Sequence, residues 1–242
     1  MAAWGETFIM QDNASVHDNT AGANGGGVIL WDKPTFTMQD SASVYDNIAG
    51  GDGGGVKTWD GTFTMQDNAS VHNNTVSGYG GGVNTDGIFT MEGNASVYDN
   101  NSGVDGGGVI TSGTFTMQGS ASVYNNTADD DGGGVDALSG IFTMQDSAVI
   151  SGNTAQWGGG VQVWGGTFTK KGGTIYGDTD TTQNGNENTS TGGWGHAVRS
   201  GDKIRNADAG PTVNLYARKY GDAWTYLDTS PGGAGDTTAN WQ

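Results

Sequence analysis

The sequence predicts an all-β protein, a parallel β-helix (β-solenoid) of about seven coils of 26–28 residues with three strands each, closed by a C-terminal cap. Two observations predict this fold. First, a Phe recurs from Phe8 to Phe168 at spacings of 28, 27, 26, 26, 27 and 26 residues. A fixed period in this range is the signature of stacked coils. Second, apolar and polar residues alternate within each repeat, which indicates half-buried strands.

The repeat at residues 62–87 shows the three strands in order. Residues 62–66 (TFTMQ), 69–72 (ASVH) and 82–85 (GVNT) each place apolar side chains on one face. Asp, Asn and Gly separate these stretches and are typical of turns. Each strand is therefore expected to pair with its copy in the next coil, about 4.8 Å away.

One polar position recurs as regularly as the apolar ones. We expect its side chains to stack at a corner, where each amide can hydrogen-bond to its copy in the next coil. This predicted ladder comprises Asn19, Asn47, Asn74, Asn100, Asn126 and Asn153.

The succession Phe-x-Met, then AS-V-x-x-N-x, then GGGV resembles the repeats of bacterial surface-associated right-handed parallel β-helix proteins, in the pectate-lyase-like β-helix superfamily. The similarity covers about residues 4–205. It implies a right-handed winding and a surface or extracellular location. It implies no particular activity, because a shared fold does not carry function.

The repeats are expected to fill residues 1–205, followed by a capping segment and loose tail at 206–242. Lys170 replaces the inward Met of the last coil, and His196 replaces a Gly of the GGGV run. Polar residues at inward sites are typical of a terminal coil. Because the sequence opens inside a repeat without a signal peptide, we expect a monomeric piece of a longer exported chain.

The charge distribution argues against two classes of partner. Residues 1–169 carry 18 Asp and Glu against two Lys, within a net charge of −17 for the chain. Such a surface would repel nucleic acid. No stretch is long and apolar enough for insertion in a membrane. The absence of Cys excludes disulfides and thiolate metal sites.

Two outward columns of rings predict carbohydrate binding. Aromatic rings beside hydroxyls suit sugars, which have an apolar face and a polar edge. The alternative is that the rings only stiffen the sheet. The candidate ligands for a polysaccharide or cell-surface glycan are His17, Tyr45, His72, Tyr98 and Tyr124, with Trp31, Trp59 and Trp164.

A second hypothesis is ice binding by a regular Thr-x-Thr face, which resembles the face of β-solenoid antifreeze proteins. The alternative is that Thr is simply favoured on an exposed strand. The face would comprise Thr35, Thr37, Thr62, Thr64, Thr90, Thr114, Thr116, Thr143, Thr167 and Thr169.

Acidic residues also recur at fixed turn positions, such as Asp12, Asp40, Asp67 and Asp146, and Asp52, Asp105 and Asp131. We expect solvated turn residues here, with Ca²⁺ as the alternative, and no other cofactor. A polysaccharide lyase or hydrolase is a third hypothesis, although the repeats before residue 170 contain no Arg to serve as a base. The sequence therefore favours a non-catalytic adhesin or spacer module.

Overall fold

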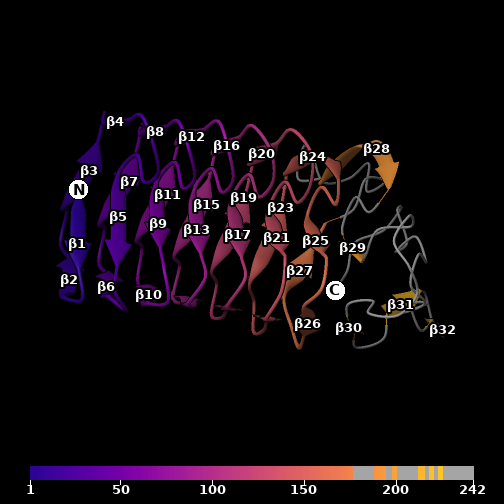
Figure 1. Cartoon of the computed structure of the whole chain (residues 1–242). Helices are drawn as coiled ribbons and strands as arrows, with labels where there is room; N and C mark the ends of the chain where they lie inside the picture. The colour runs from indigo at the N-terminus through magenta and orange to yellow at the C-terminus, as the bar shows by residue number, and fades with distance from the viewer. Residues whose placement is uncertain (177–187, 195–197, 201–211, 216–217, 221–222, 226–242) are drawn as a thin grey trace.

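The computed structural model describes residues 1–176, 188–194, 198–200, 212–215, 218–220 and 223–225, and these form a parallel β-solenoid with no helix (Figure 1). The all-β parallel solenoid predicted from the repeat is confirmed. The coils succeed one another along one axis from the N-terminal end, so residues about one repeat apart in the sequence lie side by side. The right-handed winding and the number of coils stay predictions.

Each regular coil contributes four strands, one more than predicted, to four parallel sheets. The Phe sheet holds β2 (Thr7–Met10), β6 (Thr35–Met38), β10 (Thr62–Met65), β14 (Ile88–Met91), β18 (Thr114–Met117), β22 (Ile141–Met144), β26 (Thr167–Lys170) and β30 (Thr212–Leu215). The Ser sheet holds β3 (Ser15–His17), β7 (Ser43–Tyr45), β11 (Ser70–His72), β15 (Ser96–Tyr98), β19 (Ser122–Tyr124), β23 (Val149–Ser151) and β27 (Thr174–Ile175).

The fourth strand was missed because it is only two residues long in most coils. It forms the corner sheet, with β4 (Thr20–Ala21), β8 (Ile48–Ala49), β12 (Thr75–Val76), β16 (Asn101–Ser102), β20 (Thr127–Ala128), β24 (Thr154–Trp157) and β28 (Thr189–Trp194). The Val sheet closes the coil with β1 (Ala2–Trp4), β5 (Val28–Trp31), β9 (Val56–Thr58), β13 (Val83–Thr85), β17 (Val109–Thr111), β21 (Val135–Ala137), β25 (Val161–Val163) and β29 (Val198–Ser200).

The strands pair in register, so equal residues stack. Phe63 pairs with Phe36 on one side and with Phe89 on the other. From Phe36 to Phe168 the rings of this column are completely buried, and successive ring centroids are 4.7–4.8 Å apart. Stacked Met, Ala and Val columns complete the same core. Each coil therefore buries a thin layer, and stability accumulates from coil to coil.

The Asn ladder is confirmed and is one rung longer than predicted. Asn100 Oδ1 accepts hydrogen bonds from the backbone N–H and the side-chain amide of Asn74, both at 3.0 Å. Asn100 Nδ2 donates to two backbone carbonyls, Val71 O and Tyr98 O. Beyond Asn153 the same role passes to Asn188, 35 residues later. Asn188 was missed because an insertion separates it from its repeat position.

The glycine run that precedes the Val sheet is required by close contact between coils. A Cβ atom placed on Gly107 would lie 2.5 Å from the carbonyl group of Thr127. No side chain fits there, because backbone packs directly on backbone. This contact explains why the run recurs in every regular coil.

The end of the solenoid departs from the repeat. Lys170 occupies the inward Met position of β26 and is buried, and its Nζ donates to Gly173 O at 2.6 Å. β30 pairs with β26 in parallel, so the Phe sheet extends beyond residue 205. β31 (Arg218–Tyr220) and β32 (Ala223–Thr225) pair with each other. The rest of the capping segment expected at 206–242, His196, and most of the insertion at residues 178–191 lie outside the described residues.

Candidate functional site

The rings of the Ser sheet form a continuous stack rather than separate platforms. His17, Tyr45, His72, Tyr98 and Tyr124 follow one another with ring centroids 4.7–5.0 Å apart and interplanar angles of at most 11°. The structure thus brings all five predicted residues together. Each inner ring has its two faces covered by its neighbours, so its edge is what meets solvent. A sugar could contact the hydroxyl edge of this stack, but it could not pack against the faces of the inner rings.

The Trp column is only partly continuous. Trp4, Trp31 and Trp59 stack with centroid distances of 4.9 and 5.6 Å. Lys57 Nζ lies 4.7 Å from the ring centroid of Trp59, a cation–π contact. The next three coils carry Asp86, Ser112 and Leu138 at this position. Trp164 is therefore separated from the stack, and the structure does not bring it together with the other predicted Trp residues.

The Thr-x-Thr face is the outer side of the Phe sheet. Thr64 pairs in register with Thr37 and with Thr90, so the hydroxyl-bearing side chains form straight rows. Ile9, Ile88 and Ile141 interrupt these rows and are each about half exposed (52%, 50% and 48%). The predicted ice-binding residues thus do share one regular face. Its rows are not purely Thr.

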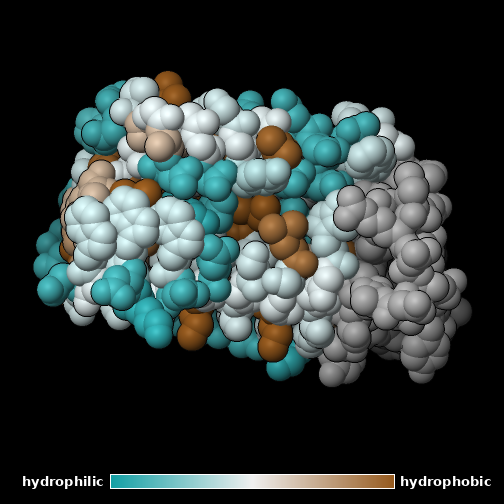
Figure 2. All heavy atoms as spheres, in the orientation of Figure 1, coloured by the Kyte–Doolittle hydropathy of each residue, from teal (hydrophilic) through white to brown (hydrophobic). Residues whose placement is uncertain are grey.

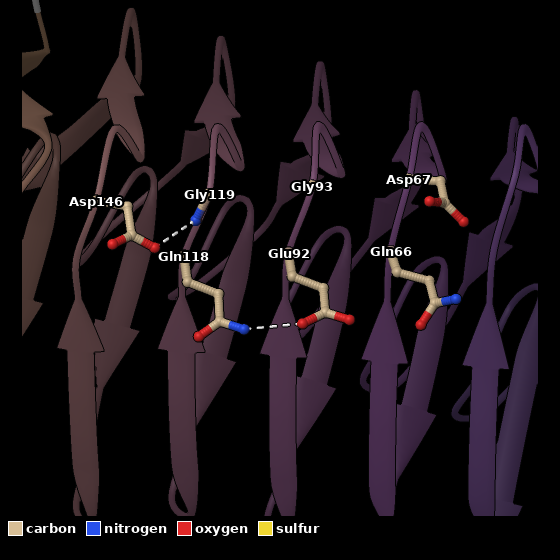
Figure 3. A pocket seen from close by; sticks show the side chains of 7 residues that line it. All are labelled: Gln66, Asp67, Glu92, Gly93, Gln118, Gly119 and Asp146. Atoms are coloured by element: carbon tan, nitrogen blue, oxygen red, sulfur yellow. Dashed lines mark hydrogen bonds between the residues drawn. The ribbon is translucent and has the colours of Figure 1, made fainter.

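A hollow of about 420 Å³ lies where the outer face of the Phe sheet runs into the following turn (Figure 3). It was not predicted from the sequence. Its lining comes from four successive coils: Gln66 and Asp67, Glu92 and Gly93, Gln118 and Gly119, and Asp146. Its walls are mainly polar, so it does not resemble a pocket for an apolar ligand.

The hollow exists because two coils lack a carboxylate that the others carry. At this turn position Asp40 Oδ2 accepts from the N–H of Asp12 at 3.0 Å, and Asp67 Oδ2 accepts from the N–H of Asp40 at 3.2 Å. In the fourth and fifth coils the position is Gly93 and Gly119. All of these residues have a positive φ of 56–65°, which both Asp and Gly tolerate. Only the side chain is missing.

Two backbone donors face the space that the missing carboxylates leave. A Cβ atom on Gly93 would lie 2.9 Å from the N of Asp67, and one on Gly119 would lie 3.0 Å from the N of Gly93. Among the residues that the structure describes, neither of these two N–H groups has a hydrogen-bond acceptor. Ligand oxygens in the hollow could accept from these two groups.

The opposite wall provides acceptors. Glu92 stands at a position where the other regular coils carry Gln. Its Oε2 accepts from Gln118 Nε2 at 2.8 Å, which holds the carboxylate in place. The other oxygen, Oε1, has no partner among the described residues and lies on the side of Gln66 (Figure 3). Asp146 closes one end, where its Oδ2 accepts from the N–H of Gly119 at 2.9 Å. At the other end, the Asp67 carboxylate points away from Gly93.

The hollow therefore pairs fixed donors with a fixed acceptor. Hydroxyl groups are the ligand groups that can accept from backbone N–H and donate to a carboxylate at once. A small anion would meet the donors but would be repelled by Glu92 and Asp146. The arrangement suits a neutral polyhydroxyl compound.

Three of the aspartates that recur at the turn after the Phe sheet have a structural role. Asp40, Asp67 and Asp146 each bind a backbone N–H of the preceding coil. This role needs no metal ion. The signal that could have revealed the hollow is the substitution of Gly for Asp at residues 93 and 119, together with Glu for Gln at residue 92.

Comparisons with protein-family models, curated proteins and solved structures found no match. In the part of the chain that the structure describes, there is no helix of the length and apolarity needed to cross a membrane. The side of the solenoid seen in Figure 2 carries mainly hydrophilic residues and residues of intermediate hydropathy, and its hydrophobic groups are scattered rather than joined in one patch.

Proposed function

We propose that this chain is a non-catalytic, extracellular β-solenoid module of the adhesin or spacer type, and that it binds a neutral glycan in the hollow beside Glu92. The observation that carries the proposal is the pairing of two unpartnered backbone N–H groups, at Asp67 and Gly93, with the oriented Glu92 carboxylate. Sugar hydroxyls satisfy both kinds of group. Binding at a shallow, polar and open site is expected to be weak, so its strength would come from repetition along a longer polymer.

The outer face of the Phe sheet supports a polymeric ligand. The rows of Thr, and the row of Gln that follows them, lead along the sheet into the hollow. Gln145 Nε2 donates to Gln118 Oε1 at 3.0 Å, so the amide row has a defined orientation. An extended chain of sugars could lie across several coils, with one unit in the hollow.

The proposal is tested on a glycan array, with affinities then measured by calorimetry. Glu92→Gln restores the residue found in the other regular coils and removes the charged acceptor, so we expect binding to weaken by about tenfold, the value of one charge-assisted hydrogen bond. Gly93→Asn combined with Gly119→Asn fills the hollow and should abolish binding. Gly22→Asn is the matched control, because its side chain would extend into open space.

The array also distinguishes glycan binding in the hollow from glycan binding at the stacked rings of the Ser sheet. A variant with Tyr45, Tyr98 and Tyr124 replaced by Ala should keep its glycan binding if it folds. Loss of binding in this variant, with full binding in the Gly93 and Gly119 variant, would transfer the site to the Ser sheet. Release of reducing or unsaturated ends from a pectin and hemicellulose panel would replace the non-catalytic assignment with the enzymatic one.

Ice binding is the second candidate, and the in-register Thr rows favour it. Replacing Thr90 and Thr116 with Lys would place bulky charges in the middle of this face. Thermal hysteresis in the wild type that disappears in this variant would support the candidate. The absence of hysteresis and of crystal shaping at high wild-type concentration would exclude it.

A further inference from the structure

A buried carboxylate lies on the outer side of the Val sheet, in the fifth coil. In β21, Val135 and Ala137 belong to the core, so Asp136 between them points away from it. Asp136 is nevertheless completely buried (0% exposed). The chain just before β21 covers it: a Cβ atom on Gly132 would lie 2.7 Å from Asp136 Cβ.

Among the described residues, neither carboxylate oxygen of Asp136 has a hydrogen-bond or ion-pair partner. In the adjacent strand, the Gln162 side chain is equally buried, and neither its oxygen nor its nitrogen is bonded to a described residue. A buried carboxylate without compensation is strongly unfavourable. Burial raises the pKa of Asp136 well above its ordinary value, and the charges of Asp105, Asp131 and Asp130 raise it further.

The three carboxylates whose charges act on Asp136 lie in the loop that leads to β21 and in the equivalent loop one coil earlier. Asp105, Asp130 and Asp131 each have an oxygen within 4.8 Å of the others. Two oxygens that bind one Ca²⁺ ion at about 2.4 Å can be no farther apart than that. The cluster is also fixed, because Asp105 Oδ1 accepts from the N–H of Asp131 at 3.0 Å.

We propose that Asp105, Asp130 and Asp131 bind a Ca²⁺ ion at this corner, and that the ion also compensates the charge of the buried Asp136 carboxylate. Calcium fits better than magnesium, because it accepts an irregular set of six to eight oxygens and exchanges its water readily. Packing alone does not require a carboxylate at this position, because Ile110 occupies it one coil earlier.

The corner is distinct from the repeat aspartates that need no metal. Asp52 occupies the same column as Asp105 and Asp131, but the next rung is Tyr79, whose N–H donates to Asp52 Oδ1 at 3.3 Å. Asp52 is therefore a matched control for Asp105. The site lies on another sheet from the hollow beside Glu92, so either proposal can fail without the other.

The test uses Ca²⁺ and its luminescent analogue Tb³⁺ on the whole chain. Trp157 pairs with Asp131 through a β-bridge, and the backbone N–H of Trp157 donates to Asp130 O at 3.0 Å. Its ring is thus a nearby sensitiser for Tb³⁺. We expect saturable Tb³⁺ emission on excitation of Trp, displaced by Ca²⁺, and one site by calorimetry. Trp157→Phe should reduce the emission and leave the calorimetric Ca²⁺ affinity unchanged.

Asp105→Asn keeps the acceptor for the Asp131 N–H and loses only the charge, so it should weaken Ca²⁺ binding at least about tenfold. Asp136→Asn should also weaken Ca²⁺ binding, and Asp52→Asn should leave the Ca²⁺ affinity unchanged. Melting followed by circular dichroism reports folding of every variant. Absence of any Ca²⁺-dependent rise in melting temperature at about 5 mM, or equal affinities in Asp105→Asn, Asp136→Asn and wild type, would overturn the proposal.

Discussion

Asp146 Oδ2 accepts a hydrogen bond from the backbone N–H of Gly119 at 2.9 Å. One coil earlier the same position is Gly119 itself, so the N–H of Gly93 has no carboxylate opposite it. The candidate glycan site is therefore a gap in an otherwise regular hydrogen-bond pattern. A repeat protein can create a specific site in this way, by omitting one side chain from a column and keeping its backbone unchanged.

Gly119→Asn should refill part of that gap. Its side-chain oxygen would accept from the N–H of Gly93, as Asp40 does for Asp12. Asn also tolerates the positive φ of 65° at this position. We expect the Gly93 amide to exchange more slowly in a hydrogen-exchange NMR experiment, with a change in unfolding free energy below about 1 kcal/mol. Unchanged exchange at Gly93 would mean that the N–H does not face the hollow.

Asn100→Ala should destabilise the chain strongly. The side chain is 1% exposed, and its loss leaves the backbone N–H of Asn74 without its acceptor. It also removes one hydrogen bond each from Asn74 Nδ2, Val71 O and Tyr98 O. Each buried unsatisfied group costs about 1–3 kcal/mol, so we expect a loss of more than about 3 kcal/mol in urea denaturation. The control is Asn19→Ala at the exposed end of the ladder, with an expected cost below about 1 kcal/mol. Similar losses at both positions would contradict the ladder's role.

His72 should make the chain sensitive to mild acid. Burial between Tyr45 and Tyr98 lowers the pKa of His72 from its ordinary value of 6.5, against the opposing charges of Asp46 and Asp99. The unfolded chain therefore takes up this proton first as the pH falls. Stability is complete above about pH 6.5, decreases below it, and levels off under the folded pKa.

His72→Tyr should remove this component of the acid sensitivity, because Tyr occupies the same position in three other coils. The measurement is the difference in melting temperature between wild type and variant from pH 7.5 to pH 5. The control is His17→Tyr at the exposed end of the stack, where the ring contacts Asp18. An equal effect of the two substitutions would argue against burial as the cause.

Lys170 should give a slope of the same sign at alkaline pH. Burial lowers the pKa of Lys170 from 10.5 to about 8. Between these two values the unfolded chain holds the proton and the folded chain does not, so stability rises with pH over this window. Lys170→Met, which restores the residue of the preceding coil, should show no such rise relative to wild type. Lys171→Met, at the exposed neighbouring position, serves as control, and a similar pH slope in wild type and Lys170→Met would refute the assignment.

Stacking is the part of this protein that its sequence specifies best. A Phe that recurs every 26–28 residues must lie over its copies once the coils are in register, so the Phe core and the Asn ladder could both be predicted. The aromatic columns were also predicted. That neighbouring rings cover the faces of the inner rings was not predicted. At a ring spacing of 4.7–5.0 Å each ring occupies its neighbour's face. The same regularity that located the columns thus limits what they can bind.

The fourth strand and the two candidate sites depended on tertiary structure. A two-residue strand such as β12 carries no readable alternation. Asp136 occupies an outward position in the sequence pattern, and only the covering loop makes it buried. The sequence alone determined a stack of β coils, because periodicity is local information repeated. Contacts between loops of neighbouring coils decided the position of the hollow and the burial of the Asp136 charge. No single repeat encodes the packing of these loops.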